Sequence, residues 1–240
     1  MKRFNNLITT TMKAALVLGF ASAMTVVPFV ARGQIVSNSL ANLATGLTLS
    51  IDDKVFSGFT YQATGLTSFD ASQILVTAFQ SGGVDYLSWS GNMALVSSGM
   101  ATGDLLLHYI VTANPGSISM IDQAYTPNVS GGLLAIDETA AIGAFGGTVV
   151  GYSHLEIGDT SDPPAEPVQG DNLNLSPSQS VLYVTKDISF GVLSANGGTI
   201  SISQVEQSFH QVPEPGTTAL TFWGGLTLAG WTFRRRFFTT

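Results

Sequence analysis

Residues 195–209 of the chain read ANGGTISISQVEQSF, and this stretch decides the fold class. Ile200 and Ile202 are separated by one polar residue, and Val205 resumes the alternation after a shift of one position past Ser203. Side chains two residues apart share one face of a β-strand, whereas a helix requires apolar residues three or four positions apart. The Asn-Gly-Gly sequence before the run is typical of a tight turn. The stretch therefore predicts a half-buried strand with an irregularity after Ser203.

The same alternation recurs in short runs along the chain, and glycine, proline, asparagine or aspartate bounds each run. Strands at a spacing of roughly eight to twelve residues favour an antiparallel β-sandwich. We therefore expect residues 34–211 to form one all-β domain of this class. Clear examples of such runs are KVFSGFTYQ at 54–62, where Gly58 disturbs the register, DLLLHYIVTA at 104–113 and SVLYVTKDISFGVL at 180–193.

Two stretches of this region do not follow the alternation clearly. LLAIDETAAIGAF at 133–145 is ambiguous between strand and helix. Residues 158–179, GDTSDPPAEPVQGDNLNLSPSQ, contain four prolines and several carboxylates. Proline cannot donate a hydrogen bond to a strand ladder, so this second stretch predicts a long surface loop.

The charge of the chain is distributed unevenly. Between Gln34 and Gln211 there are only two basic residues, Lys54 and Lys186, against fifteen carboxylates, which gives a formal charge of −13. Phosphate backbones would repel such a body, which excludes nucleic acid as a partner. The chain has no cysteine, so disulfides, thiolate metal sites and cysteine nucleophiles are excluded as well.

The sequence contains no recognisable catalytic motif. The three histidines, His108, His154 and His210, are far apart, and no pair has the spacing of a zinc site. There is no G-x-S-x-G nucleophile elbow, although a Ser-His-Asp arrangement assembled by the fold stays open. GAFGGTVVG at 143–151 lacks the dinucleotide-binding spacing and is interpreted as a turn followed by a strand. We expect a protein that is not an enzyme and has no cofactor and no bound metal.

Two alternatives for ligand binding remain open at this level. Carboxylates could supply oxygen ligands to calcium, which tolerates irregular geometry; the candidates are Asp52 and Asp53, together with Asp159, Asp162, Glu166 and Asp171. Exposed aromatic rings could stack on sugars, and the candidates are Tyr86, Trp89 and Tyr125, but the sequence YLSWSG favours a core position for Trp89.

The first 33 residues have the three parts of a secretory signal peptide. Lys2, Arg3 and Lys13 form a positive leader, an apolar run follows, and small residues precede Gln34. We expect cleavage before Gln34; a cut after residues 21–23 and a retained membrane anchor are the alternatives.

The chain ends in VPEPGTTALTFWGGLTLAGWTFRRRFFTT, residues 212–240. Residues 216–233 carry no charge and, as a helix, would extend about 27 Å, close to the hydrocarbon thickness of a bilayer. Basic residues after a span stay on the cytoplasmic side. We therefore expect a single transmembrane helix at 216–233 anchored by Arg234, Arg235 and Arg236. An ordinary tail anchor would explain these features, but not the Pro-Glu-Pro that precedes them.

Val212, Pro213, Glu214 and Pro215, followed by an apolar segment and an arginine cluster, resemble the PEP-CTERM sorting signal, which is also catalogued as the C-terminal domain of ice-binding proteins. The resemblance covers residues 212–240. It implies export in a Gram-negative bacterium that makes exopolysaccharide, processing by an exosortase (a membrane cysteine transpeptidase), and release from the inner membrane to the cell surface or matrix. The body also resembles a group of PEP-CTERM proteins through IDDKVFSGFTY at 51–61 and the strands within 184–209.

These features together predict three regions: a signal peptide at 1–33, a β-sandwich at 34–211 and a sorting signal at 212–240. The partners implied are signal peptidase, an exosortase, the membrane before processing, and exopolysaccharide. The expected function is that of a structural or adhesive matrix protein. The alternatives are a glycan-binding, ice-binding or carbohydrate-active protein on the same β-scaffold.

Overall fold

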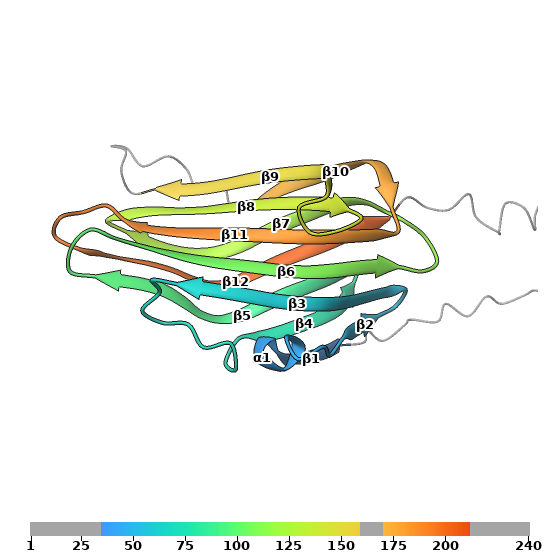
Figure 1. Cartoon of the computed structure of the whole chain (residues 1–240), viewed down its shortest axis with the longest axis horizontal. Coiled ribbons are helices and arrows are strands. Elements are labelled where there is room, and N and C mark those ends of the chain that lie inside the picture. Colours follow the sequence, from blue (N-terminus) through green and yellow to red (C-terminus); the bar gives the residue numbers. More distant parts are fainter. Residues whose placement is uncertain (1–34, 159–169, 212–240) are drawn as a thin grey trace, which may run out of the picture. The chain divides into compact units, whose positions relative to one another are not determined.

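A computed structural model describes residues 35–158 and 170–211, which form two six-stranded antiparallel sheets packed face to face (Figure 1). Sheet A consists, in spatial order, of β1 (Ile35–Ser39), β4 (Leu75–Ser81), β5 (Val84–Ser97), β12 (Gly198–Gln211), β7 (Ile118–Ser130) and β10 (Gly170–Gln179). Sheet B consists of β2 (Leu49–Ile51), β3 (Lys54–Thr64), β6 (Ala101–Ala113), β11 (Val181–Val192), β8 (Gly132–Ile142) and β9 (Thr148–Gly158). A single-turn helix, α1 (Leu40–Leu43), lies between β1 and β2. The expected all-β sandwich is confirmed.

The last eight strands form one long hairpin that is folded over itself. β8 pairs with β9 at the tip, and the pairs β7 with β10, β6 with β11 and β5 with β12 follow outward from it. Successive pairs belong to alternate sheets, which is the jelly-roll arrangement. The glycine-rich sequence at 143–147 makes the turn at the tip, as the sequence indicated, with φ of +85° at Gly143 and +70° at Gly146.

The core lies between the sheets and follows directly from the alternation. In β6, Leu105, Leu107, Tyr109 and Val111 are buried while the residues between them are half-exposed. Aromatic rings fill the centre: the ring centroids of Trp89 and Tyr109 are 5.4 Å apart. Burial of one face of each strand supplies most of the free energy that holds two such sheets together.

The two predicted strand irregularities are both present. The pairing of β3 with β6 shifts register between Ser57 and Thr60, and Gly58 in between has φ +62°, which a residue with a Cβ rarely adopts. The pairing of β12 with β7 shifts between Ile202 and Gln204, where β12 has one residue more than β7. Because each shift adds one residue, apolar side chains on both sides of it stay on the core face.

The expectation of a continuous loop at 158–179 is wrong for its second half. Residues 170–179 form β10, an edge strand paired with β7 through Asn174, and Leu173 and Leu175 are buried. The alternating residues 172–175 (NLNL) form part of this strand although the residues around them are polar. The register shifts between Asn174 and Gln179, and Pro177 lies within this interruption, where an edge strand tolerates a missing donor. The ambiguous stretch at 133–145 is a strand, most of β8, and the turn after it.

Several expectations fall outside the described residues. These are the signal peptide at 1–33, the sorting motif Val212–Pro215, the helix at 216–233 and the arginine anchor Arg234–Arg236. Among residues 35–158 and 170–211, no helix has the length and apolar character needed to cross a membrane.

Trp89 offers a test of the core. Replacing Trp89, which is 1% exposed between the sheets, by alanine leaves a large cavity, so we expect the free energy of unfolding to fall by about 3–5 kcal/mol. Val96 on the same strand is 51% exposed, and Val96→Ala should change stability by less than about 1 kcal/mol. Urea unfolding followed by far-UV circular dichroism, which reports the backbone rather than the tryptophan, measures both variants. Equal losses of unfolding free energy in Trp89→Ala and Val96→Ala would contradict the described packing.

Candidate functional site

Both lysines of the described body point inward. The side chains of Lys54 and Lys186 are 2% and 1% exposed. Residues 35–158 and 170–211 contain no other lysine and no arginine, so their surface presents carboxylates without any permanently cationic side chain. This division of charge could not be read from composition, which counts the lysines but does not place them.

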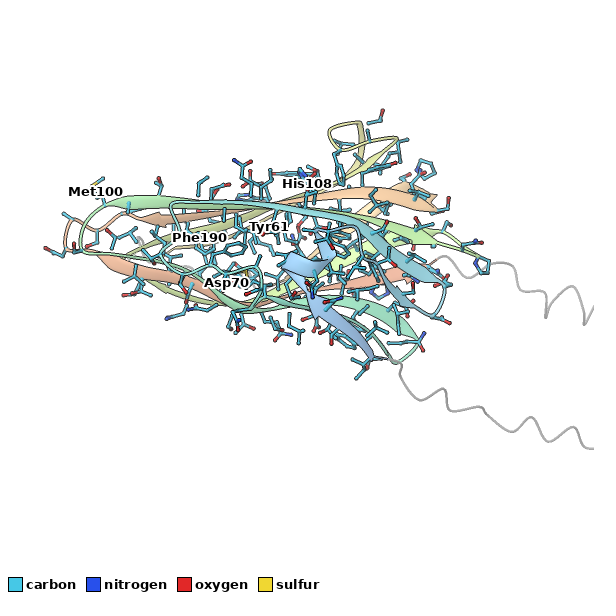
Figure 2. The ribbon with its side chains drawn as sticks, turned by 60° about the horizontal axis from the view of Figure 1, so that its bottom comes forward. Tyr61, Asp70, Met100, His108 and Phe190 are labelled. Carbon is cyan, nitrogen blue, oxygen red and sulfur yellow. The ribbon has the colours of Figure 1, made fainter. Side chains whose placement is uncertain are left out.

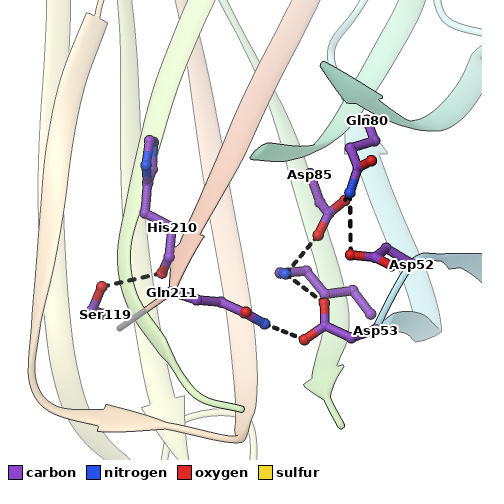
Figure 3. Close-up of polar contacts among 8 residues, drawn as sticks. Asp52, Asp53, Gln80, Asp85, Ser119, His210 and Gln211 are labelled. Carbon is purple, nitrogen blue, oxygen red and sulfur yellow. Dashed lines mark hydrogen bonds and ion pairs between the residues drawn. The ribbon is translucent and has the colours of Figure 1, made fainter. Parts of the chain in front are cut away.

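Lys54 is the first residue of β3 in sheet B, and its ion pair with Asp85 on β5 joins it to sheet A; Figure 3 labels Asp85 and the residues around it. Its Nζ is 2.6 Å from Oδ2 of Asp85 at the start of β5 and 2.8 Å from Oδ1 of Asp53. Gln211 at the end of β12 donates a hydrogen bond from its side-chain amide to Asp53. Gln80 bridges Asp52 and Asp85 with 3.1 Å hydrogen bonds.

A pocket of about 280 Å³ opens at this end and is lined in part by Asp52, Lys54, Asp85 and His210. Oxygen atoms of Asp52, Asp53 and Asp85 lie within 4.8 Å of one another, so the fold adds a third carboxylate to the predicted calcium pair. The ammonium group of Lys54, however, already occupies the position that a cation would take between Asp53 and Asp85. The arrangement is therefore satisfied by an internal cation. Asp171, the other described member of the predicted set, belongs to β10 and is not among these three carboxylates.

The fold also brings together a serine, a histidine and an aspartate on the outer side of sheet A. Ser208 Oγ is 3.1 Å from His210 Nε2, and the same Nε2 is 2.8 Å from Asp122 Oδ2. A catalytic triad needs the serine on one ring nitrogen and the aspartate on the other, so that the histidine can pass a proton between them. Because both partners contact Nε2, this arrangement cannot activate Ser208 by that route.

The outer face of sheet B carries the other two histidines. His108 on β6 is half-buried, its ring stacks on Phe145 with centroids 4.7 Å apart, and burial lowers its pKa (Figure 2). His154 on β9 pairs with Asp137 at 2.8 Å, and this hydrogen bond raises its pKa. His108 is thus a packed strand residue, as expected, and the three histidines do not converge on a common site.

Carboxylates run across the same face of sheet B. Asp187 on β11 lies directly opposite Asp137 on β8, and it also contacts Asp104 on β6. Burial, reinforced by the contact with Asp104 and by the charge of Asp137, raises the pKa of Asp187 to about 6. Burial also acts to raise the pKa of Asp137, but hydrogen bonds from Tyr152 and His154 outweigh it and the pKa is lowered.

The predicted sugar-stacking aromatics are placed differently from one another. Trp89 is 1% exposed and belongs to the core, as its sequence context favoured. Tyr125 is 5% exposed and also belongs to the core, so the hypothesis that its ring is available is wrong. Tyr86 faces outward from sheet A and stacks on Phe79 at a centroid distance of 4.9 Å. Tyr152 on the outer face of sheet B is 59% exposed, more than Tyr61 at 39%.

A polar network that the sequence patterns did not predict lies in the middle of the core. Lys186 contacts Glu138 on the neighbouring strand and Gln123 in the opposite sheet. Gln207 donates to Glu138 at 2.6 Å, and Tyr109 donates to Gln207 at 2.7 Å. A signal was available: Lys186 stands between Val184 and Ile188 at core-facing positions of an alternating run, and such positions rarely hold a charge without a partner.

Comparisons with known proteins give remote similarities only. No protein-family model and no curated protein matches the chain. Among solved structures, TmCBM61 in complex with β-1,4-galactotriose has 8% identity, covers 62% of this chain and 88% of its own, and has a TM-score of 0.28. A structure of carbohydrate-binding modules from the β-sandwich superfamily has 15% identity, 65% and 57% coverage and a TM-score of 0.32. The enzymatically active domain of tailspike protein 4 of bacteriophage CBA120 has 13% identity, 65% and 20% coverage and a TM-score of 0.30. Similarities this remote carry no argument about ligand or activity.

The raised pKa of Asp187 leads to a prediction about pH. The folded chain binds this proton more tightly than the unfolded chain, so its stabilising contribution is complete below the ordinary pKa of 3.8 and is lost as the pH rises through 6. Asp187→Asn cannot ionise. We therefore expect the variant to gain stability over the wild type above pH 6 and to lose that advantage near pH 4, measured by urea unfolding. Ser189→Ala, on the same strand, should keep the wild-type pH dependence, and an Asp187→Asn curve parallel to the wild type would contradict the prediction.

Proposed function

We propose that this chain is an exported, exosortase-sorted protein of the cell surface or extracellular matrix, with a structural or adhesive rather than an enzymatic role. The observation that carries the proposal for the body is the placement of its charge: both lysines lie inside, and the described outer surface is acidic without a lysine or arginine. A surface of one sign keeps neighbouring copies apart and well hydrated, and it attracts cations rather than acidic partners.

The interior supports a non-enzymatic role as well. The space between the sheets is filled by side chains such as Trp89, Phe190 and Phe209, each 1% exposed. Where the fold gathers catalytic residue types, at Ser208, His210 and Asp122, their geometry does not suit proton relay.

The sorting part of the proposal rests on the terminal sequences. A positive leader with an apolar run at one end and Pro-Glu-Pro, an uncharged segment and three arginines at the other occur in one chain, and each supports the interpretation of the other. In this proposal the β-sandwich is the cargo, and residues 212–240 serve only to deliver it.

Glycan binding on the outer face of sheet B is a second candidate, favoured by Tyr152. Its ring is 59% exposed, its hydroxyl donates to Asp137 at 2.5 Å, and Thr139 and Thr185 follow it along the same cross-strand row. A fixed aromatic ring beside hydroxyl groups can stack on a sugar and bond its hydroxyls.

For this second candidate, we expect native gels containing a neutral polysaccharide such as galactan or dextran to retard the protein, and Tyr152→Ala to abolish at least about 90% of that retardation. Val149→Ala, an exposed apolar position on the same strand, is the matched control. Equal retardation of Tyr152→Ala and wild type would exclude this face as the binding surface.

The sorting proposal is tested at Glu214. Glu214→Ala leaves the uncharged segment and the arginines intact, so a plain membrane anchor would be unaffected, whereas an exosortase substrate should accumulate uncut in the inner membrane. The measurement is intact mass and cell fraction of the protein in a host that carries the exosortase. Thr217→Ala, just outside the motif, should be processed like the wild type. Equal release of wild type and Glu214→Ala would refute recognition of Pro-Glu-Pro.

A further inference from the structure

An amine, a carboxamide and a carboxylate meet at the centre of the sandwich. The amine of Lys186 on β11 lies 2.5 Å from Oε1 of Gln123 on β7, in the opposite sheet. The carboxylate of Glu138 on β8 contacts the same amine through Oε2. As whole residues, Lys186, Glu138 and Gln123 are 0%, 0% and 3% exposed, so these three residues are closed to bulk water.

We propose that Lys186 and Gln123 join in an intramolecular isopeptide bond, with Glu138 as the catalytic proton carrier. Nζ of Lys186 forms a bond to the side-chain carbonyl carbon of Gln123, and the bond from that carbon to Nε2 breaks. The lysine amine and the glutamine amide become one secondary amide, and the former Nε2 leaves as ammonia. No oxidant, reductant or further reactant is needed.

The first proton transfer follows the contact between Lys186 and Glu138. An ammonium group cannot attack, so Glu138 first takes a proton from Nζ, and the neutral amine uses its lone pair. A charged pair sealed from water carries a large desolvation penalty, which transfer of that proton removes. Glu138 passes that proton to the leaving nitrogen and accepts the second proton that Nζ loses as the amide forms, so ammonia departs neutral, the new amide is neutral and Glu138 ends protonated. Nε2 of Gln123 donates a hydrogen bond to Ser153 Oγ on β9, which holds the leaving group away from the amine.

The remaining contacts hold the carboxylate in place. Oε1 of Glu138 accepts a hydrogen bond of 2.6 Å from Gln207, which in turn accepts one of 2.7 Å from the Tyr109 hydroxyl. Burial raises the pKa of Tyr109 well above its ordinary value, so this phenol remains a donor. With Oε1 occupied, Oε2 is the oxygen that faces the lysine. Fixing amine, amide and carboxylate together replaces a bimolecular encounter by a unimolecular step.

The bond would connect residues 63 positions apart and tie sheet B to sheet A. Such a cross-link restricts the unfolded chain as a disulfide does, and this chain has no cysteine with which to make one. The inference is independent of how the protein is sorted.

Lys54 provides an internal comparison. It also joins the two sheets, but both of its partners, Asp53 and Asp85, are carboxylates, and its site borders a pocket that opens to solvent. An amide bond between Lys54 and either carboxylate would form with loss of water, and the solvent in the pocket opposes that reaction. We therefore expect Lys54 to remain a free amine, which makes Lys54→Met the matched control for Lys186→Met.

The test is the intact mass of the purified, denatured chain as the host processes it, with its termini established from peptides. We expect a deficit of one ammonia, about 17 Da, against the mass calculated for those termini, and a peptide pair linked through Lys186 and Gln123 after proteolysis. The deficit should persist in Lys54→Met and disappear in Lys186→Met and in Glu138→Gln, the second of which keeps both joined side chains. The cross-linked wild type should also migrate faster than these two variants in a denaturing gel.

The linked peptide is sought in the wild type, so the test does not depend on the variants folding. A wild-type chain at its full calculated mass, with Lys186 and Gln123 recovered in separate peptides, would overturn the proposal. So would a deficit of one water, about 18 Da, which would indicate condensation of a lysine with a carboxylate instead.

Discussion

A lysine and a glutamate side by side in the middle of an apolar interior are the constraint on which the rest of this sandwich depends. Removing either partner of such a pair leaves an uncompensated charge and costs about 3–5 kcal/mol. The pair of Lys186 and Glu138 is tolerated because amides from the opposite sheet complete its hydrogen bonds, through Gln123 on β7 and Gln207 on β12. The two sheets must therefore pack in one register, since sliding either would break these contacts.

The same constraint shapes the surface. With Lys186 inside the core and Lys54 inside the cluster at the end of the sandwich, the exposed carboxylates of the described body have histidine as their only basic neighbours. On sheet B, Asp104 and Asp137 lie close to Asp187, and burial together with these neighbours raises the pKa of Asp187 to about 6, while hydrogen bonds from Tyr152 and His154 lower the pKa of Asp137. An acidic exterior over a firmly connected interior would suit the hydrated extracellular matrix in which we propose that this protein works.

Much of the fold could be predicted because its strands follow the period of two so closely. The turn at 143–147 and the irregularities at Gly58 and Ser203 could be placed to within a residue or two. β10 was missed because proline and carboxylates dominate its surroundings, although Leu173 and Leu175 alternate correctly. The candidate sites are harder to predict: the sequence favours a core position for Trp89, but it leaves Tyr125 open as a sugar-binding ring, because alternation alone does not say which face of a sheet is covered.

The sequence by itself determined the β-class, the acidic character of the body, the absence of disulfides and the expectation of export, because composition and periodicity are local properties. Only the tertiary structure decided which polar residues meet. Lys186 and Gln123 are 63 positions apart, and Ser208 and Asp122 are 86 apart. Their contacts depend on which strands pair and on how the folded hairpin is divided between two sheets. The packing of the whole core determines these long-range pairings, and no local sequence pattern specifies them.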